Sequence, residues 1–415
     1  MTHTPADDRV SGAAWSLLLF LTLLNVLNFV DRQLIASLAP LLIADLGLSR
    51  AQIGLLVGFA FVVFYTLMGL VLGVAADRMS RVKLLAGGLG LWSAMTAVSG
   101  MAQSFLHLAI PRVLVGVGEA TLTPAALSML ADAFPRKRLG MATGVYYAGI
   151  PLGTALSLII AGMMAPRFGW RACFYVLGII GLVAVGALFL LREPARGGGA
   201  GGQATPSLRE VLTDVAGALR TQPALWLVML GGTLLVYGSG AALHAVTWLV
   251  QERGFAFQTA AYAAGVIAVA GGFGGNLLGG WFADWCARRW QGGRLWSLVL
   301  LTLVTTPFAV GLYLLPTSNP LFYACWVVAS ASTTAWFGPV FSVIQELSPA
   351  RVRSTLVAVG LLVMNLFGVG PGPWITGLLG DRFSLTVGLL SSLAVVLTAV
   401  VPFTLGAMAL RKART

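Results

Sequence analysis

The chain of 415 residues alternates between long apolar stretches and short polar connections. Each apolar stretch has about 18 residues or more with few charges, which is enough to cross a bilayer core of about 30 Å as a helix. The pattern therefore predicts an all-α polytopic membrane protein with twelve transmembrane helices. We place these helices at 14–43, 51–75, 84–104, 107–132, 138–164, 172–192, 223–250, 258–282, 295–315, 320–346, 352–380 and 384–410.

The composition agrees with this class. Hydrophobic residues make up 58% of the chain and charged residues 10%, whereas roughly a quarter of the residues in a soluble domain are charged. The formal net charge is +12, but 19 of the 26 Lys and Arg lie in the two tails and in the connections on one side of the predicted membrane. This asymmetry predicts that both termini are cytoplasmic. The basic balance is a topology signal, so no nucleic-acid partner is expected.

One long connection, at 193–222, divides the chain into two halves of six helices. Its GGGAGG core is typical of a flexible linker. Ser207 and Glu210 then form a capping-box pattern ahead of a helical apolar stripe, which predicts a short amphipathic helix in this linker. We therefore predict an N-terminal six-helix bundle at 1–192 and a C-terminal six-helix bundle at 223–415.

A Gly-x3-Asp-x3-Arg motif closes two of the predicted helices. It ends the second helix at Asp77 and Arg81, and it ends the eighth helix at Asp284 and Arg288. An acid-x2-Pro pattern, followed by basic residues, likewise ends the fourth and the tenth helices. Matching motifs at matching helix ends predict two parallel six-helix repeats, which is the layout of the major facilitator fold.

Two charged residues, Asp31 and Arg32, lie side by side in the middle of the first apolar stretch. Ionised groups at such a depth cost about 2.5 to more than 10 kcal/mol, so they face a cavity or a partner. Adjacent residues of a helix do not face each other, so these two charges should not simply neutralise one another. Each therefore needs a partner elsewhere, which makes the pair a hypothesis for a functional site.

The fourth apolar stretch carries two more charged residues, Arg112 and Glu119, within RVLVGVGEA. Their spacing of seven residues places them on one helix face, about 10.5 Å apart along the axis. Counted from the cytoplasmic helix ends, Glu119 and Asp31 reach comparable depths. We interpret both carboxylates as candidate proton-coupling groups whose charge depends on a nearby Arg. A structural ion pair between the first and fourth helices is the alternative.

The fifth helix contains Gly149, Pro151 and Gly153 in the stretch GIPLG. Pro kinks a helix and neighbouring glycines allow it to bend, so these residues are candidates for a gating hinge, or for a kink that merely fits the packing. Among the aromatic residues, Tyr146 and Trp336 are candidates for lining a substrate cavity. Core packing or an interfacial belt is the alternative for both.

The sequence lacks the signatures of an enzyme. None of its lysines follows a glycine, so there is no P-loop, and no G-x-S-x-G, HExxH or paired-cysteine motif is present. Its three cysteines lie in or beside apolar segments, where inert packing is expected. We therefore predict that the protein is not an enzyme and that it needs no cofactor or metal ion.

Four stretches together resemble the spinster family of the major facilitator superfamily: NFVDRQLIASLAP, GVAADRMSRVK, RVLVGVGEATLTPAALSMLADAFP and YYAGIPLG. The resemblance covers helices one to five most clearly. It implies that Asp31 and Glu119 are protonation sites and that Arg32 binds an anionic headgroup, with Arg112 as a second candidate for substrate binding. For Asp77, which closes the second helix with Arg81, it implies a latch that holds one conformation; Asp284 and Arg288 would repeat it.

The resemblance also implies a function, namely a proton-coupled secondary active transporter that works by alternating access. Its substrate would be an anionic amphiphile such as a lysophospholipid or a lipid like sphingosine 1-phosphate. The alternative is a proton-coupled transporter of small organic anions or drugs. A receptor or lipid-binding protein that does not transport is disfavoured, because binding alone needs neither the carboxylates nor the gate motifs. We expect protons and membrane lipids as partners, a monomer, and the inner membrane of a bacterium.

Overall fold

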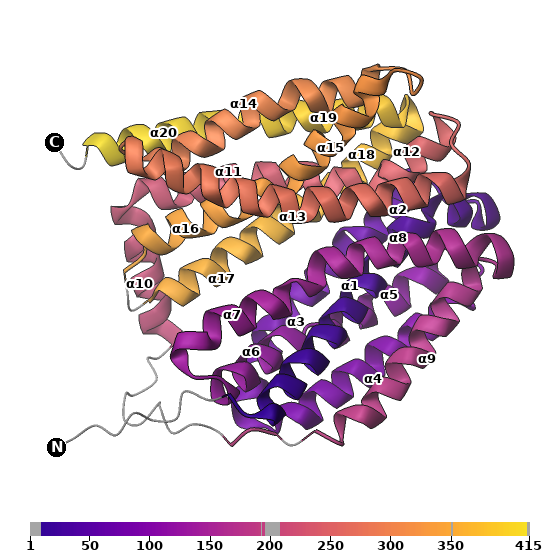
Figure 1. Ribbon diagram of the computed structural model, residues 1–415, viewed down its shortest axis with the longest axis horizontal. Helices are drawn as coiled ribbons and strands as arrows, with labels where there is room; N and C mark the ends of the chain where they lie inside the picture. The colour runs from indigo at the N-terminus through magenta and orange to yellow at the C-terminus, as the bar shows by residue number, and fades with distance from the viewer. Residues whose placement is uncertain (1–9, 192, 196–207, 350–351, 413–415) are drawn as a thin grey trace. The chain divides into compact units, whose positions relative to one another are not determined.

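The computed structural model describes residues 10–191, 193–195, 208–349 and 352–412, and all regular elements in these ranges are helices (Figure 1). Twelve helical spans in this part of the chain are long and apolar enough to cross a membrane. The prediction of twelve transmembrane helices is therefore confirmed.

Contacts divide the chain into two compact units. The first unit comprises Met1–Leu34 and Phe64–Gln203, and the second comprises Ile35–Val63 and Ala204–Thr415. The second unit thus takes in the end of the first transmembrane span and the start of the second span, besides the whole second half of the chain.

The first unit is built around the bundle shown in indigo to magenta in Figure 1. Within it α4 packs against α5 and α9, and α8 packs against α9. Gly88 and Gly118 permit the close approach of α4 and α5, because a Cβ at Gly118 would lie 2.7 Å from the carbonyl oxygen of Gly88. The helices with residues in this unit are α1 (Gly12–Leu46), α3 (Phe59–Arg78), α4 (Arg81–Ser99), α5 (Phe105–Glu119), α6 (Leu122–Ala133), α7 (Arg136–Tyr147), α8 (Gly149–Phe168) and α9 (Trp170–Leu188).

In the second unit α13 packs against α14 and α15, and α11 packs against α19 and α20. A glycine stripe on α13 makes this possible, since a Cβ at Gly275 or Gly279 would collide with the backbone of α15. The helices of this unit, beside the ends of α1 and α3, are α2 (Arg50–Val57), α10 (Leu208–Thr221), α11 (Pro223–Ala241), η1 (Ala242–His244), α12 (Ala245–Gln251), α13 (Phe257–Arg289), α14 (Gly293–Leu314), α15 (Pro320–Ala335), α16 (Phe337–Leu347), α17 (Arg353–Met364), the π-helix η3 (Asn365–Val369), α18 (Pro371–Arg382), α19 (Leu385–Thr398) and α20 (Val400–Lys412).

Helix α10 occupies the place of the short helix expected in the linker. It packs against α11 and α17. Ser207, the first residue of the predicted capping box, lies outside the described residues, and so does the side chain of Glu210.

Several membrane spans are broken near their middle. The fourth span is interrupted between α5 and α6, directly after Glu119, and the tenth is interrupted between α15 and α16, at Trp336. The fifth span breaks at Ala148, just before Gly149 and Pro151, where a Pro in the first turn of α8 is tolerated because its missing N–H would be unsatisfied anyway. These breaks place candidate site residues at helix ends inside the bundles.

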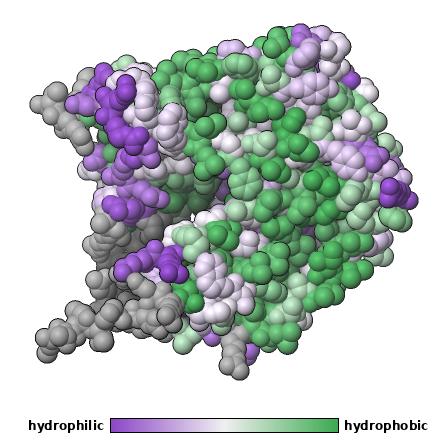
Figure 2. Space-filling model, in the orientation of Figure 1, coloured by the Kyte–Doolittle hydropathy of each residue, from purple (hydrophilic) through white to green (hydrophobic). Residues whose placement is uncertain are grey.

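Apolar side chains cover much of the visible surface, as Figure 2 shows in green. The exposed set includes Leu190 at 85%, Leu277 at 72% and Val183 at 69% of their full accessibility. Large apolar residues at such exposure are those that lipid would cover in a membrane protein.

Candidate functional site

Arg32 and Glu119 form an ion pair inside the first unit, between α1 and the end of α5. Arg32 Nη2 lies 3.0 Å and Nε lies 3.2 Å from Glu119 Oε2. The carboxylate is fully buried, whereas 25% of the Arg32 side chain is exposed. The pair therefore has a buried acidic partner and a basic partner that a ligand can still reach.

Two aromatic rings of the same unit contact the Arg32 guanidinium. Its Cζ lies 4.4 Å from the ring centroid of Tyr65 and 4.7 Å from that of Phe29. Such cation–π contacts are worth about 0.5–2 kcal/mol each and hold the group where its charge is useful. The neighbourhood of Arg32 thus combines one cation with aromatic surface, which suits an anion that carries an apolar part.

Asp31, the neighbour of Arg32 in the chain, has a different partner. Its Oδ2 accepts a 2.6 Å hydrogen bond from the hydroxyl of Thr96 on α4, and the residue is buried at 5% exposure. The diverging directions of adjacent helical side chains explain why Asp31 reaches α4 while Arg32 reaches α5. The two carboxylates of the candidate site are therefore held by separate hydrogen bonds.

Arg112 supports the site through the backbone. It is buried at 3% exposure, and its Nη2 donates a 2.7 Å hydrogen bond to the carbonyl oxygen of Arg32. This bond fixes α1 against α5 at the level of the ion pair. Arg112 is thus buried and bonded to the backbone of Arg32, whereas the Arg32 side chain is partly exposed.

Glu119 has one oxygen left over. Its Oε1 is buried and makes no hydrogen bond of ordinary geometry within the described ranges; the amide of Asn28 on α1, whose Nδ2 is likewise left over, is its neighbour. A buried acceptor without a donor is costly, and it marks a place where a proton or a ligand group can be accommodated. Glu119 also ends α5, where the helix dipole does not favour a negative charge, so its Arg partner matters more.

The start of α8 is pressed against α1 beside this site. Asn25 Nδ2 on α1 donates a 2.8 Å hydrogen bond to the carbonyl oxygen of Tyr146. A Cβ at Gly149 would lie 3.0 Å from the same amide, and a Cβ at Gly153 would lie 2.6 Å from Cβ of Phe29. The two glycines therefore serve close packing here, while Pro151 lies between them in the first turn of α8.

At the other end of this unit, Arg81 is the most heavily bonded side chain of the Gly-x3-Asp-x3-Arg motif. It is 1% exposed and pairs with Asp132 and with Glu193, whose Oε1 lies 3.0 Å from Arg81 Nε. Its Nη2 donates to the carbonyl oxygen of Pro194 at 2.7 Å. The side chain of Asp77, the acid of this motif, lies outside the described residues.

Glu193 was not among the residues singled out from the sequence, because it lies in the linker beyond the helix. Its Oε2 accepts from the hydroxyl of Ser80 at 2.6 Å, and its Oε1 accepts from the backbone N–H of Arg81 at 3.0 Å. Burial raises the pKa of Glu193, but these hydrogen bonds and the Arg81 guanidinium outweigh it and lower the pKa to about 2. The carboxylate thus caps α4 and neutralises its motif arginine.

The matching motif in the second unit is paired differently. Arg294, from the start of α14, pairs with Asp284 at 2.9 Å and also with Glu346. Arg288 lies exposed at the end of α13 and lines a cavity with Arg294. The structure therefore brings Asp284 to an arginine other than the one in its own motif.

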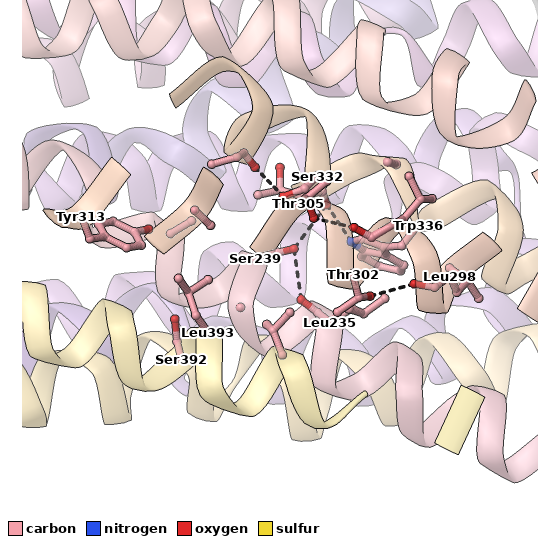
Figure 3. A pocket seen from close by; sticks show the side chains of 18 residues that line it. Leu235, Ser239, Leu298, Thr302, Thr305, Tyr313, Ser332, Trp336, Ser392 and Leu393 are labelled. Atoms are coloured by element: carbon pink, nitrogen blue, oxygen red, sulfur yellow. Dashed lines mark hydrogen bonds between the residues drawn. The ribbon is translucent and has the colours of Figure 1, made fainter. Parts of the chain in front are cut away.

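Trp336 lies in the wall of an uncharged cavity of about 80 Å³ within the second unit (Figure 3). Hydroxyl groups line much of it, among them Ser239, Thr302 and Thr305. They donate to backbone carbonyls, and Trp336 Nε1 donates to the carbonyl oxygen of Thr333 at 2.7 Å. Their oxygen lone pairs remain available, so the cavity suits a small uncharged group that donates hydrogen bonds.

The second unit holds another contact that the sequence did not indicate. Asp381 on α18 accepts 2.9 Å hydrogen bonds from the backbone N–H groups of both Arg50 and Ala51, at the start of α2. The Arg50 side chain donates to Gln251 at 2.9 Å. A carboxylate at a helix N-terminus is favoured by the helix dipole, so Asp381 ties α2 to α18.

Comparisons with known proteins extend these observations. The family model of the Major Facilitator Superfamily matches residues 21–373. The chain is 32% identical over 388 residues to an MFS-type efflux pump of Mycolicibacterium smegmatis, which covers 92% of this chain and 88% of that protein. It is 25% identical over 382 residues to the protein spinster of Drosophila melanogaster, which covers 90% of this chain and 63% of that protein.

The fold is also similar to a solved structure. This is the crystal structure of a bacterial homolog to the human lysosomal transporter Spinster, in an inward-facing and unoccupied conformation. The TM-score is 0.87 at 25% sequence identity, over 97% of this chain and 98% of that one.

A chain with twelve membrane-spanning helices that matches this family model over most of its length belongs to the major facilitator superfamily of membrane transporters. Within that superfamily it is spinster-like, as the match to the bacterial homolog of Spinster shows over nearly the whole chain. It is a multi-pass membrane transporter for a small molecule, and it is not an enzyme.

Proposed function

We propose that the protein is a proton-coupled secondary active transporter that moves an anionic amphiphile, such as a lysophospholipid or a lipid like sphingosine 1-phosphate, by alternating access. One observation carries the proposal. Arg32 is bound by the buried carboxylate of Glu119, while a quarter of its side chain remains exposed and two aromatic rings contact its guanidinium. A substrate headgroup and the Glu119 carboxylate can therefore compete for the same guanidinium.

This competition supplies a coupling mechanism. A proton on Glu119 removes its negative charge and frees Arg32 for an anionic headgroup. When Glu119 loses the proton, its carboxylate can bind Arg32 again and displace the headgroup. Asp31, on α1, is the second buried carboxylate of the candidate site. It is bonded to Thr96 on α4 and not to Arg32, so it can take up a proton separately from Glu119. A ligand shifts a conformational equilibrium only by its differential affinity for the two states, and here protonation changes that affinity.

The cavity beside Trp336 is a separate candidate binding place, within the second unit, for an uncharged and partly apolar group. Its volume of about 80 Å³ fits a part of a molecule and not a whole lipid, so it would hold a hydroxyl-bearing segment. For the membrane, we propose the inner membrane of a bacterium with both termini in the cytoplasm, because Lys and Arg concentrate on the side of the tails.

Uptake into proteoliposomes tests the proposal. The purified protein should accumulate a lysophospholipid or sphingosine 1-phosphate when a pH gradient is imposed, and Asp31→Asn and Glu119→Gln should each abolish the response to the gradient. Arg32→Ala should lower the affinity for the lipid. If both carboxylate variants keep the response to the pH gradient, the coupling proposal fails.

A second candidate substrate class is small organic anions or drugs, which the name of the Mycolicibacterium smegmatis relative favours. The same proteoliposomes distinguish the two classes. Uptake of organic anions or drugs with no uptake of either lipid would select this second class and leave the coupling site in place.

A further inference from the structure

A basic cavity lies at one end of the second unit, where α13 ends and α14 begins. Its volume is about 630 Å³, and the turn between these helices, α16 and α20 all contribute to its wall. The charged residues of its lining are Arg288, Arg289, Arg294 and Glu346, so positive charge prevails. Figure 2 shows hydrophilic side chains gathered at the end of this unit where α14 begins and α20 ends.

Comparison of the two repeats shows that, within the described residues, the motif arginine of this cavity has fewer acidic partners than its counterpart in the first unit. In the first unit the motif residue Arg81 is buried and bonded to two carboxylates, Asp132 and Glu193. In the second unit the repeat of Asp132 is Glu346, and it is bonded by Arg294, which also holds Asp284. The repeat of Arg81 is Arg288, which is exposed and has no acidic partner within the ranges that the structure describes.

No counterpart of Glu193 occurs at the described end of the second unit. Glu193 follows the last helix of the first half, whereas α20, the last helix of the second half, has Leu410 in the cavity wall and Arg411 in its last turn. The guanidinium group of Arg411 stacks on Trp296, 5.7 Å from its centroid. The last turn of α20 thus carries a base, whereas an acid follows α9, and the cavity keeps its positive charge.

Arg289 adds a second guanidinium whose orientation is fixed. Its Cζ lies 4.5 Å from the ring centroid of Trp285, one turn earlier on α13. Like Arg288, it is exposed and has no acidic partner in the described part of the chain. Arg288 and Arg289 are consecutive on the helix, so their side chains diverge, but both line the cavity, and each guanidinium is a fork-shaped donor that matches the oxygens of a phosphate group.

The surface that leads to this cavity is apolar. On α13, Trp281 follows Leu277 by four residues and Arg288 follows Trp281 by seven, so the three side chains share one helix face. Leu277 is 72% exposed and Trp281 is 62% exposed, which are values expected for side chains that contact acyl chains. Trp290, in the cavity wall, is a residue type enriched at the level of lipid headgroups.

From these observations we infer that the cavity binds the phosphate of an anionic membrane phospholipid, with its acyl chains along the Leu277 and Trp281 face. The headgroup would supply in the second unit the negative charge that Glu193 supplies in the first. Basic pockets at the cytoplasmic ends of membrane helices are suited to such headgroups. This site is separate from the transport site and does not depend on the substrate proposed above.

Lipid titration of the full-length protein in a neutral detergent tests the inference. Dioleoyl-phosphatidylglycerol should raise the thermal unfolding midpoint and remain bound in native mass spectrometry, whereas dioleoyl-phosphatidylcholine should do neither. The double variant R288Q/R289Q should weaken phosphatidylglycerol binding by about tenfold or more, because each lost charge–phosphate contact removes on the order of 1 kcal/mol.

The control is R167Q/R382Q, which removes the same charge from two exposed arginines on α8 and α18. It should bind phosphatidylglycerol like the wild type. Equal loss in R167Q/R382Q would show a general charge effect and overturn the inference, as would unchanged binding in R288Q/R289Q. An equal stabilisation by inorganic phosphate alone would overturn the assignment to a lipid.

Discussion

Arg32 is the residue at which the contacts of the first unit converge. Its guanidinium binds Glu119 and contacts the rings of Phe29 and Tyr65, while its carbonyl oxygen accepts a hydrogen bond from Arg112. Breaking a buried ion pair by removing one partner costs about 3–5 kcal/mol, whereas replacing a partner by a competing anion need not. The ion pair is therefore suited to an exchange of partners. A headgroup can displace Glu119 from Arg32 if the Glu119 carboxylate takes up a proton.

Glu119→Gln keeps the size of the side chain and removes its charge. We expect the ratio of uptake with and without a pH gradient to fall by about 5–150-fold, which is the range of typical coupling free energies. The measurement is initial uptake in proteoliposomes at two external pH values. Arg32→Lys is the companion variant: it keeps a charge but loses the bidentate and stacked geometry, so it should impair substrate affinity. Unaltered pH dependence in Glu119→Gln would remove this residue from the mechanism.

Tyr65→Leu removes one of the two aromatic rings that contact Arg32, together with its hydroxyl group, and leaves a smaller apolar side chain. A cation–π contact of about 0.5–2 kcal/mol converts to a two- to thirtyfold rise in KM if the ring orients Arg32 for the substrate. The maximal rate should change less than KM. A KM equal to that of the wild type would mean that the stacking has only a structural role.

At the scale of helices, the breaks and the close contacts of glycines set where side chains meet. The break after Glu119 ends α5 at the ion pair, and the break at Ala148 starts α8 with two glycines against α1. The acid that follows α9 returns to cap α4. Each of these features fixes a helix end near a charged group. The positions at which the helices end therefore determine the geometry of the candidate site.

Gly153→Ala tests the packing of α8 on α1. The added methyl group would lie 2.6 Å from Cβ of Phe29, so the helices must separate, and we expect a loss of about 1–3 kcal/mol of stability. Gly140→Ala is the matched control, since that glycine also lies in a helix but has open space around it. It should be neutral or stabilising by about 0.5–1 kcal/mol. Thermal unfolding in detergent measures both, and equal effects would contradict the packing role.

Glu193→Gln tests the cap of α4 through its pH dependence. The pKa of Glu193 is lowered from 4.5 to about 2. A depressed pKa stabilises the folded state fully above the unfolded value, and the contribution is lost as pH falls from about 4.5 towards 2. The wild type should therefore be more stable than the variant at pH 7, and the difference should shrink on acidification through that window. A difference that stays constant down to pH 2 would contradict the proposed ionic cap.

The sequence could predict much of this arrangement. Twelve spans follow from hydrophobic length, and the contact of Arg32 with Glu119 agrees with the comparable depths that helix geometry assigns to charges on the first and fourth helices. Glu193 could not be found in this way, because it lies in an irregular segment with no periodicity. Nor could the sequence show that Arg294 would bond Glu346, because the choice between nearby arginines depends on the turn between α13 and α14.

At the scale of the whole molecule, alternating access requires contacts that form in one state and break in another. We propose that the contact of Asp381 with α2, which joins segments far apart in the sequence, is one of them. Gly54 and Gly58 bring α2 against α18 and the residue before it, because a Cβ at either would collide with the backbone of Pro373 or Gly370. A tight interface capped by one carboxylate suits a closure that opens cooperatively.

Asp381→Asn removes the negative charge that accepts from two backbone N–H groups. We expect faster amide hydrogen exchange in peptides that cover 49–57, by about fivefold or more, since a charged hydrogen bond contributes about 1.5–3 kcal/mol. Exchange in α4 should not change. If the α2 peptides exchange at the wild-type rate, this carboxylate does not control the opening of the contact.

The central claim is that protons move with the substrate because a carboxylate and an anionic headgroup compete for Arg32. Substrate-driven proton flux tests it most directly: a lysophospholipid is added to proteoliposomes that contain a pH-sensitive dye and no imposed gradient. The wild type should change the internal pH when the lipid is added, and Glu119→Gln should not, although it still binds lipid. Lipid transport without any change of internal pH in the wild type, or an equal change in Glu119→Gln, would contradict the account.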